Sequence, residues 1–104
     1  MNRTVVGGIV RQVERIDKHL SFVTLTPISD EGWSETRVPV YMEVRKEYVG
    51  KVVDVITERS DLFGRNFRQT LEGADMSIST EMPYFLVKKI NDTYRRLETQ
   101  QVRH

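Results

Sequence analysis

The chain has 104 residues, 16 Lys or Arg against 15 Asp or Glu, a formal net charge of +1 at pH 7, and no cysteine. This length suits one domain with a buried core, and the lack of cysteine excludes disulfides, thiolate metal sites and a cysteine nucleophile. No apolar run is long enough to cross a membrane, and the first residues lack the layout of a signal peptide. We therefore expect a single cytoplasmic domain without a membrane partner.

The charge is divided unevenly along the chain. Residues 1–82 carry 11 basic and 13 acidic side chains, a net charge of −2, whereas residues 83–104 carry five basic and two acidic ones. A basic tail of this kind allows a local contact with an anionic partner, although a solvated polar helix face is the more frequent reason for such an excess.

The first 80 residues are predicted to be mostly β-strand, because Val, Ile and Thr are frequent and Gly or Asp clusters separate short apolar runs. Residues 4–16 form a long first strand, with Gly7 and Gly8 at the place where it has to bend. Alternation along this strand puts its apolar residues on two faces, Val6 and Val10 on one, and Ile9 and Val13 on the other. After a turn at residues 17–19, a second strand at 20–28 pairs back on the first.

The segment RVPVYMEV, with the Arg that follows it, alternates with a period of two from residue 37 to 45 and predicts a third strand. The apolar face consists of Val38, Val40, Met42 and Val44, and the polar face of Arg37, Tyr41, Glu43 and Arg45. Pro39 has no N–H to donate, so this strand is expected at a sheet edge or with a bulge. Further strands are predicted at residues 51–59, 66–72 and 75–82.

The chain changes character at Pro83, which suits the first turn of a helix. From residue 84 to about 101 there is no Gly or Pro, and apolar residues recur with helical spacing at Leu86, Val87, Ile90, Tyr94 and Leu97. The opposite face carries Lys88, Lys89, Asp92, Arg95 and Arg96. Residues 1–82 are thus predicted to be one β-barrel domain. Residues 83–104 are predicted to be a basic amphipathic helix and tail that packs on this domain or on a partner, since an isolated helix of this length is marginal in water.

The order of these elements resembles the five-stranded OB-fold barrel over residues 4–72. The resemblance rests on Gly7 and Gly8 in a long first strand, and on Gly50 ahead of the predicted strand at 52–56. It implies a first strand that curves sharply to join both halves of a barrel, whose closure removes exposed sheet edges. The expected fold is all-β or β-dominated, a five- to six-stranded OB-like small barrel with a C-terminal amphipathic α-helix. An SH3-like barrel or an open meander gives much the same pattern.

Few residues indicate catalysis or metal binding. His19 lies in a predicted turn and His104 at the last position, which makes them a poor pair for a metal site. Asp54 and Glu58 lie on the exposed side of a strand, and no phosphate-binding glycine motif is present. We therefore expect no catalytic activity, no metal and no cofactor. A ligand pocket in the barrel mouth is the least favoured of three hypotheses.

The first hypothesis is a barrel that binds single-stranded DNA or RNA. Its motivation is SDLFGRNFRQT at residues 60–70, where rings that can stack on bases alternate with arginines that can hold phosphates. Phe67 shares a strand face with Gln69 and Leu71, so it is expected in the core. The predicted nucleic-acid-binding residues are Arg37, Tyr41, Arg45, Phe63, Arg65 and Arg68.

The alternative is a protein-interaction or assembly module, such as an accessory subunit of a larger complex or a homo-oligomer that pairs through its C-terminal helix. The residues expected to contact the partner are Leu86, Ile90, Tyr94 and Leu97 on the apolar face, with Lys88, Lys89, Arg95 and Arg96 on the basic face. Near-neutral charge and mixed surface signs fit this alternative as well as the first hypothesis, which the segment at 60–70 favours slightly.

Overall fold

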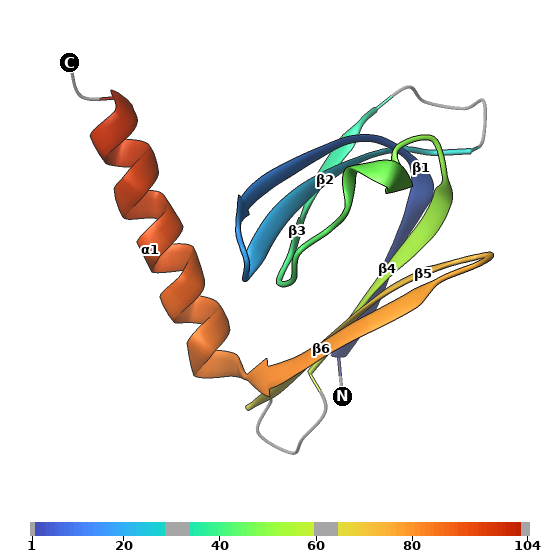
Figure 1. The fold of residues 1–104 in the computed structure, drawn as a ribbon. Coiled ribbons are helices and arrows are strands. Elements are labelled where there is room, and N and C mark those ends of the chain that lie inside the picture. Colours follow the sequence, from blue (N-terminus) through green and yellow to red (C-terminus); the bar gives the residue numbers. More distant parts are fainter. Residues whose placement is uncertain (1, 29–33, 60–64, 103–104) are drawn as a thin grey trace.

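A computed structural model describes residues 2–28, 34–59 and 65–102. In chain order its elements are β1 (Asn2–Asp17), β2 (Leu20–Thr26), β3 (Thr36–Val40), the 3-10 helix η1 (Lys46–Tyr48), β4 (Val52–Arg59), β5 (Asn66–Gly73), β6 (Ser77–Pro83) and α1 (Tyr84–Val102). The protein is therefore β-dominated with a C-terminal helix, as its sequence predicts (Figure 1).

The strands form one antiparallel sheet in the order β3-β2-β1-β4-β5-β6. β1 is shared between two halves of this sheet, because its first part pairs with β4 and its second part with β2. The change of partner occurs at Ile9, which lies opposite both Thr26 and Val52. A Cβ at the neighbouring Gly8 would overlap the carbonyl oxygen of Thr26, so glycine permits this close approach of β1 and β2. Figure 1 shows β1 curving along its length, as expected of the first strand.

A bulge in β1 decides which of its side chains reach the core. The register with β2 shifts between Val10 and Gln12. Val10 and Val13 are consequently buried in the same cluster, whereas strict alternation predicts them on opposite faces. The sequence-based placement of Val13 is therefore wrong, because an extra residue in the strand reverses the alternation that follows it.

The third strand is shorter than predicted. β3 ends at Val40, and the chain bends through Tyr41 and Met42. The prediction that Tyr41 lies on an outward polar face is wrong, because only 7% of its surface is exposed and its ring packs edge-on against Phe67. The expected edge position is confirmed, since β3 borders the sheet.

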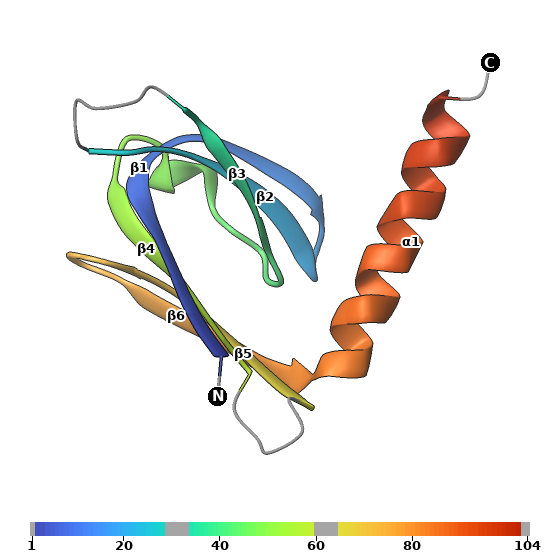
Figure 2. The ribbon, with the colours of Figure 1, turned by 180° about the vertical axis from the view of Figure 1, so that it is seen from behind.

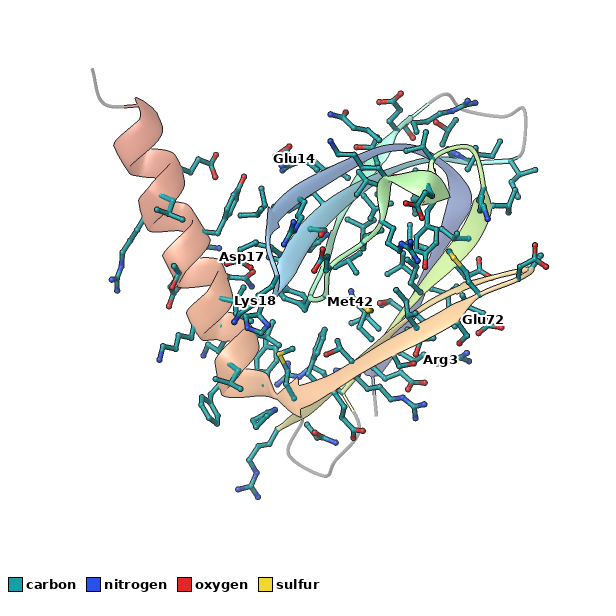
Figure 3. All side chains as sticks on the ribbon, in the orientation of Figure 1. Arg3, Glu14, Asp17, Lys18, Met42 and Glu72 are labelled. Carbon is teal, nitrogen blue, oxygen red and sulfur yellow. The ribbon has the colours of Figure 1, made fainter. Side chains whose placement is uncertain are left out.

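The concave side of the curved sheet holds the main core. Its buried residues are Val10, Val13, Val23, Leu25, Val40, Val44, Val53, Val55 and Leu71. Met42 packs against this cluster, and Figure 3 shows its side chain inside the curve of the sheet. A second cluster consists of Leu20, Tyr41, Phe67 and Val87 and joins the sheet to α1. The burial of Phe67 confirms its predicted place in the core.

The sheet does not close into a barrel through backbone pairing, because β3 and β6 remain its two borders. Figures 1 and 2 show an open, strongly curved sheet. The buried Gln69 of β5 spans the gap to the chain at the end of β3. Its Nε2 donates to the carbonyl oxygen of Pro39 at 2.9 Å, and its Oε1 accepts from the N–H of Tyr41 at 2.8 Å. A side-chain amide thus bonds to the border of β3 as a strand peptide group would.

α1 follows β6 directly and runs beside the hairpin of β1 and β2 (Figures 1 and 2). The N–H of its first residue, Tyr84, donates to the carbonyl oxygen of Arg65 at 2.6 Å. The guanidinium of Arg59 lies over the Tyr84 ring, 3.7 Å from its centroid. These contacts fix the start of the helix against the end of β4 and the residue that precedes β5. In the part of the chain that the structure describes, no helix is both long and apolar enough for a membrane span.

Candidate functional site

An apolar groove of about 490 Å³ lies between α1 and the end of the sheet. The helix lines it with Leu86, Lys89, Ile90, Thr93, Tyr94 and Leu97, and the sheet lines it with Ile16, Asp17, His19, Leu20, Thr80 and Met82. Figure 3 shows Asp17 and Lys18 at the tip of the β1–β2 hairpin, next to α1. The volume falls within the range of sites that bind ligands or partner side chains.

One stripe of α1 docks the helix on the sheet. Val87 is 3% exposed and belongs to the second core cluster. One turn later, Asn91 Oδ1 accepts a hydrogen bond from the hydroxyl of Tyr41 at 3.0 Å. Tyr94 lies a further turn along, with its ring centroid 5.1 Å from that of Phe22. These residues are spaced four and three apart, so they share one side of the helix.

A second, neighbouring stripe of α1 faces the groove. Leu86, Ile90 and Thr93 recur at the same spacing and end at Leu97, of which 48% is exposed. The predicted partner face therefore has two roles in the structure: Leu86 and Leu97 line the groove, whereas Ile90 and Tyr94 line it and also pack against the second core cluster. The apolar surface of α1 is wide enough for the helix to pack on the sheet and still leave the groove accessible.

The basic residues predicted on α1 are all exposed, at Lys88, Lys89, Arg95 and Arg96. Lys89 stands in the groove, and Lys88 and Arg96 lie around a shallow depression on another side of the helix. Phe85 borders that depression and is 66% exposed.

Arg37 is held by three neighbours on the sheet and helix. Its Nη2 lies 3.1 Å from Oε1 of Glu14, and its guanidinium stacks 3.7 Å from the centroid of the Phe22 ring. A side-chain hydrogen bond with Tyr94, more than the ion pair with Glu14, raises the pKa of Arg37 above its usual value. Arg37 therefore ties β1, β2 and α1 together, and a phosphate would have to compete with these contacts.

Tyr41 is buried in the cluster that joins the sheet to α1. Burial raises the pKa of its phenol above the usual value. The hydroxyl is therefore held as a neutral donor between the sheet and α1. It is no exposed ring on which a base could stack.

The remaining predicted nucleic-acid-binding residues with a described position are Arg45, Arg65 and Arg68. Arg45 is exposed and pairs with Glu47 at 3.0 Å. Arg65 is exposed just before β5, and Phe63 lies outside the described residues. Arg68 lies on the convex side of β5, away from Arg37 in the strand order.

Arg68 belongs to a row of alternating charges across the convex side of the sheet. The row runs through Arg3, Glu58, Arg68 and Glu81, each opposite the next in strand register. Nε of Arg3 is 3.3 Å from Oε1 of Glu58. Figure 3 shows Arg3 and Glu72 on this outer side. Because Arg68 stands between two carboxylates, its charge is compensated within the sheet.

Several groove residues were missed by the sequence reasoning. Thr80 and Met82 lie in the strand predicted at residues 75–82, but only the fold brings these side chains beside α1. Asp17 was assigned to a turn, where its Oδ1 accepts from the N–H of His19 at 2.7 Å. Asn91, on the docking stripe, was not predicted, because a single amide in an amphipathic helix forms no recognisable sequence pattern. Among residues 2–28, 34–59 and 65–102, no three His, Cys, Asp or Glu side chains are placed to hold a metal ion.

Comparison of the chain with models of protein families, with curated proteins and with solved structures found no match.

Proposed function

We propose that the protein is a non-catalytic interaction module that binds an apolar segment of a partner protein in the groove between α1 and the β1–β2 hairpin. The observation that carries this proposal is the open stripe of Leu86, Ile90 and Leu97 on a helix that is already docked through another stripe. An apolar surface left accessible beside polar rim residues is characteristic of interaction sites.

The shape of the groove favours a protein segment over a compact ligand. From Leu86 to Leu97 the groove follows α1 for about 16 Å, at 1.5 Å per residue. An extended or helical segment with several apolar side chains fits such a length. The groove lining includes the opposite charges of Lys89 and Asp17, so it sets no preference for the net charge of the segment.

We also propose that the curved sheet is a variant of the OB fold. The strand order β3-β2-β1-β4-β5 and the sharing of β1 between two halves support it. So does Gly50, which has a φ of 91° ahead of β4, a conformation that favours glycine. In this variant the Gln69 side chain takes the place of backbone pairing at the seam, and β6 is an additional strand.

Site-specific photocrosslinking tests the groove as a binding site. A photoreactive phenylalanine analogue is placed at Leu97 in the groove, or at Val5 on the convex side of β1 as a control. The two positions have similar exposure, at 48% and 52%. We expect a discrete crosslinked protein from position 97 and none of that species from position 5. Identical products from both positions contradict a specific groove.

Binding of single-stranded nucleic acid is a second candidate function, and the outward side of α1 supports it. Phe85 is exposed beside Lys88, Lys89 and Arg96. A ring there can stack on a base for about 1–3 kcal/mol while the cations contact phosphates. Labelled oligonucleotides titrated at several salt concentrations test this. Salt-sensitive binding that Phe85→Ala and Lys88→Gln weaken, but Arg45→Gln does not, supports it. No binding at low salt contradicts it.

A further inference from the structure

The β6 strand leaves one border of the sheet without a backbone partner. β6 pairs with β5 along its length, and it is the last strand in the sheet order. No other described element pairs with its second side. In Figure 1 it forms the orange border of the sheet that leads into α1.

The register identifies the peptide groups that point outward from this border. The N–H of Tyr84 donates to the carbonyl of Arg65, and the N–H of Gly73 donates to the carbonyl of Met76. Hydrogen-bonded pairs alternate along an antiparallel ladder, so Ile78, Thr80 and Met82 direct their peptide groups toward β5. Ser77, Ser79 and Glu81 therefore present their N–H and C=O groups at the open border.

The two borders of the sheet differ in their protection against pairing. At the β3 border, Pro39 has no N–H, and the side chain of Gln69 already bonds to the Pro39 carbonyl and the Tyr41 N–H. β6 is less protected, with Glu81 as its one charged side chain. Its pairing with β5 has no bulge, it carries no Lys or Arg, and its proline is the last residue of the strand.

We propose that two copies of the protein associate through β6, antiparallel to each other, around a two-fold axis at Thr80. This surface adjoins the groove, whose sheet wall includes Thr80 and Met82, and it differs from the helix-driven pairing considered as an alternative from the sequence. Main-chain hydrogen bonds of Ser79 and Glu81 with Glu81 and Ser79 of the second copy join the two sheets into one.

Side-chain complementarity favours this register over those with an axis at Ser79 or Glu81. An axis at Thr80 places Ile78 opposite Met82 of the second copy on the concave side, so apolar residues meet. On the convex side it places Glu81 opposite Ser79 of the second copy. An axis at Glu81 would set two carboxylates against each other, and an axis at Ser79 would set Ile78 against a threonine.

Sedimentation of the full chain, from micromolar to near-millimolar concentration, tests the proposal. We expect a reversible shift from monomer to dimer for the natural chain and for Ser79→Ala, and a monomer for Ser79→Pro. Proline removes an N–H that the fold itself does not use. Both variants lose the contact between the Ser79 and Thr70 hydroxyls at 3.0 Å, so alanine is the matched control. A natural chain that stays monomeric, or a proline variant that dimerises like the alanine variant, overturns the proposal.

A charge pair tests the register without changing the backbone. Position 79 is exposed on the convex side and lies opposite Glu81 of the second copy. Ser79→Lys should tighten the dimer and Ser79→Glu should weaken it, with dissociation constants about tenfold apart because each contact occurs twice. Equal dissociation constants, or the reverse order, overturn the two-fold pairing at Thr80. The thermal unfolding midpoints of the Ser79→Lys and Ser79→Glu monomers should equal that of the natural chain. The difference in dissociation constant then arises from the contact between the two β6 strands.

Discussion

Gln69 links two strands that are distant in the sheet order, and its loss should be costly. Gln69→Leu keeps the volume similar but leaves the Pro39 carbonyl and the Tyr41 N–H without their partner. Each unsatisfied buried group costs about 1–3 kcal/mol, so we expect the free energy of unfolding to fall by about 2–4 kcal/mol. Denaturant unfolding measures this, with the exposed Gln12→Leu as a control expected to change little. Equal effects of the two substitutions would show that Gln69 does not bridge the gap.

Tyr41 gives the protein a specific response to high pH. Its folded-state pKa is raised by burial, so the folded protein holds the phenolic proton more tightly than the unfolded chain does. The stability from this difference is complete below the unfolded pKa of about 10 and is lost as pH rises through the folded pKa. Tyr41→Phe should lower the free energy of unfolding by about 1 kcal/mol at pH 7 through loss of the bond to Asn91. The difference from the natural chain should shrink above pH 10, and a constant difference from pH 7 to 11 contradicts this role.

The contrast between Phe67 and Tyr41 shows where alternation succeeds and fails. Phe67 lies in a regular strand, and its parity with Leu71 predicted burial correctly. Tyr41 follows the last residue of β3, so the parity that placed it outward no longer applied. Val13 was misplaced for a related reason, the register shift after Val10. Strand ends and bulges depend on tertiary pairing, which a single sequence does not display.

The helix α1 has a docking stripe, a groove stripe and a solvated side. Two substitutions distinguish the docking stripe from the solvated side. Val87 is 3% exposed in the second core cluster, whereas Phe85 is 66% exposed. Val87→Ala should lower the free energy of unfolding by about 1–3 kcal/mol because it leaves a cavity. Phe85→Ala should change it by less than about 0.5 kcal/mol. Similar losses for both, measured by denaturant unfolding, would mean that α1 is not docked through Val87.

The elements themselves were more predictable than their arrangement. The break at Pro83 located α1, which begins at Tyr84, and short runs rich in Val, Ile and Thr between Gly or Asp clusters located the strands β4, β5 and β6. Local composition and flanking residues sufficed here. The groove was not predictable, since it forms only where α1 turns back beside the β1–β2 hairpin. The apolar residues of the helix were predicted from the sequence, but the strand residues that face them were not.

On the surface of the sheet, nearby carboxylates compensate the charges of three predicted nucleic-acid contacts. Arg37, Arg45 and Arg68 are predicted contacts, and each has a carboxylate beside it or opposite it in register. The groove, in contrast, is mainly apolar, and its lining includes Lys89 and Asp17. The fold thus places the apolar groove and the charge-balanced convex face of the sheet on different sides, which suits the proposed module that binds protein.

The affinity of the crosslinked partner, purified and titrated calorimetrically against three forms of the full chain, tests the groove most directly. The forms are the natural chain, Leu97→Asp in the groove and Val5→Asp on the convex side, both at exposed positions. We predict equal dissociation constants for the natural chain and Val5→Asp, and a dissociation constant at least about tenfold higher for Leu97→Asp. Binding by Leu97→Asp that equals that of the natural chain would contradict the groove as the functional surface.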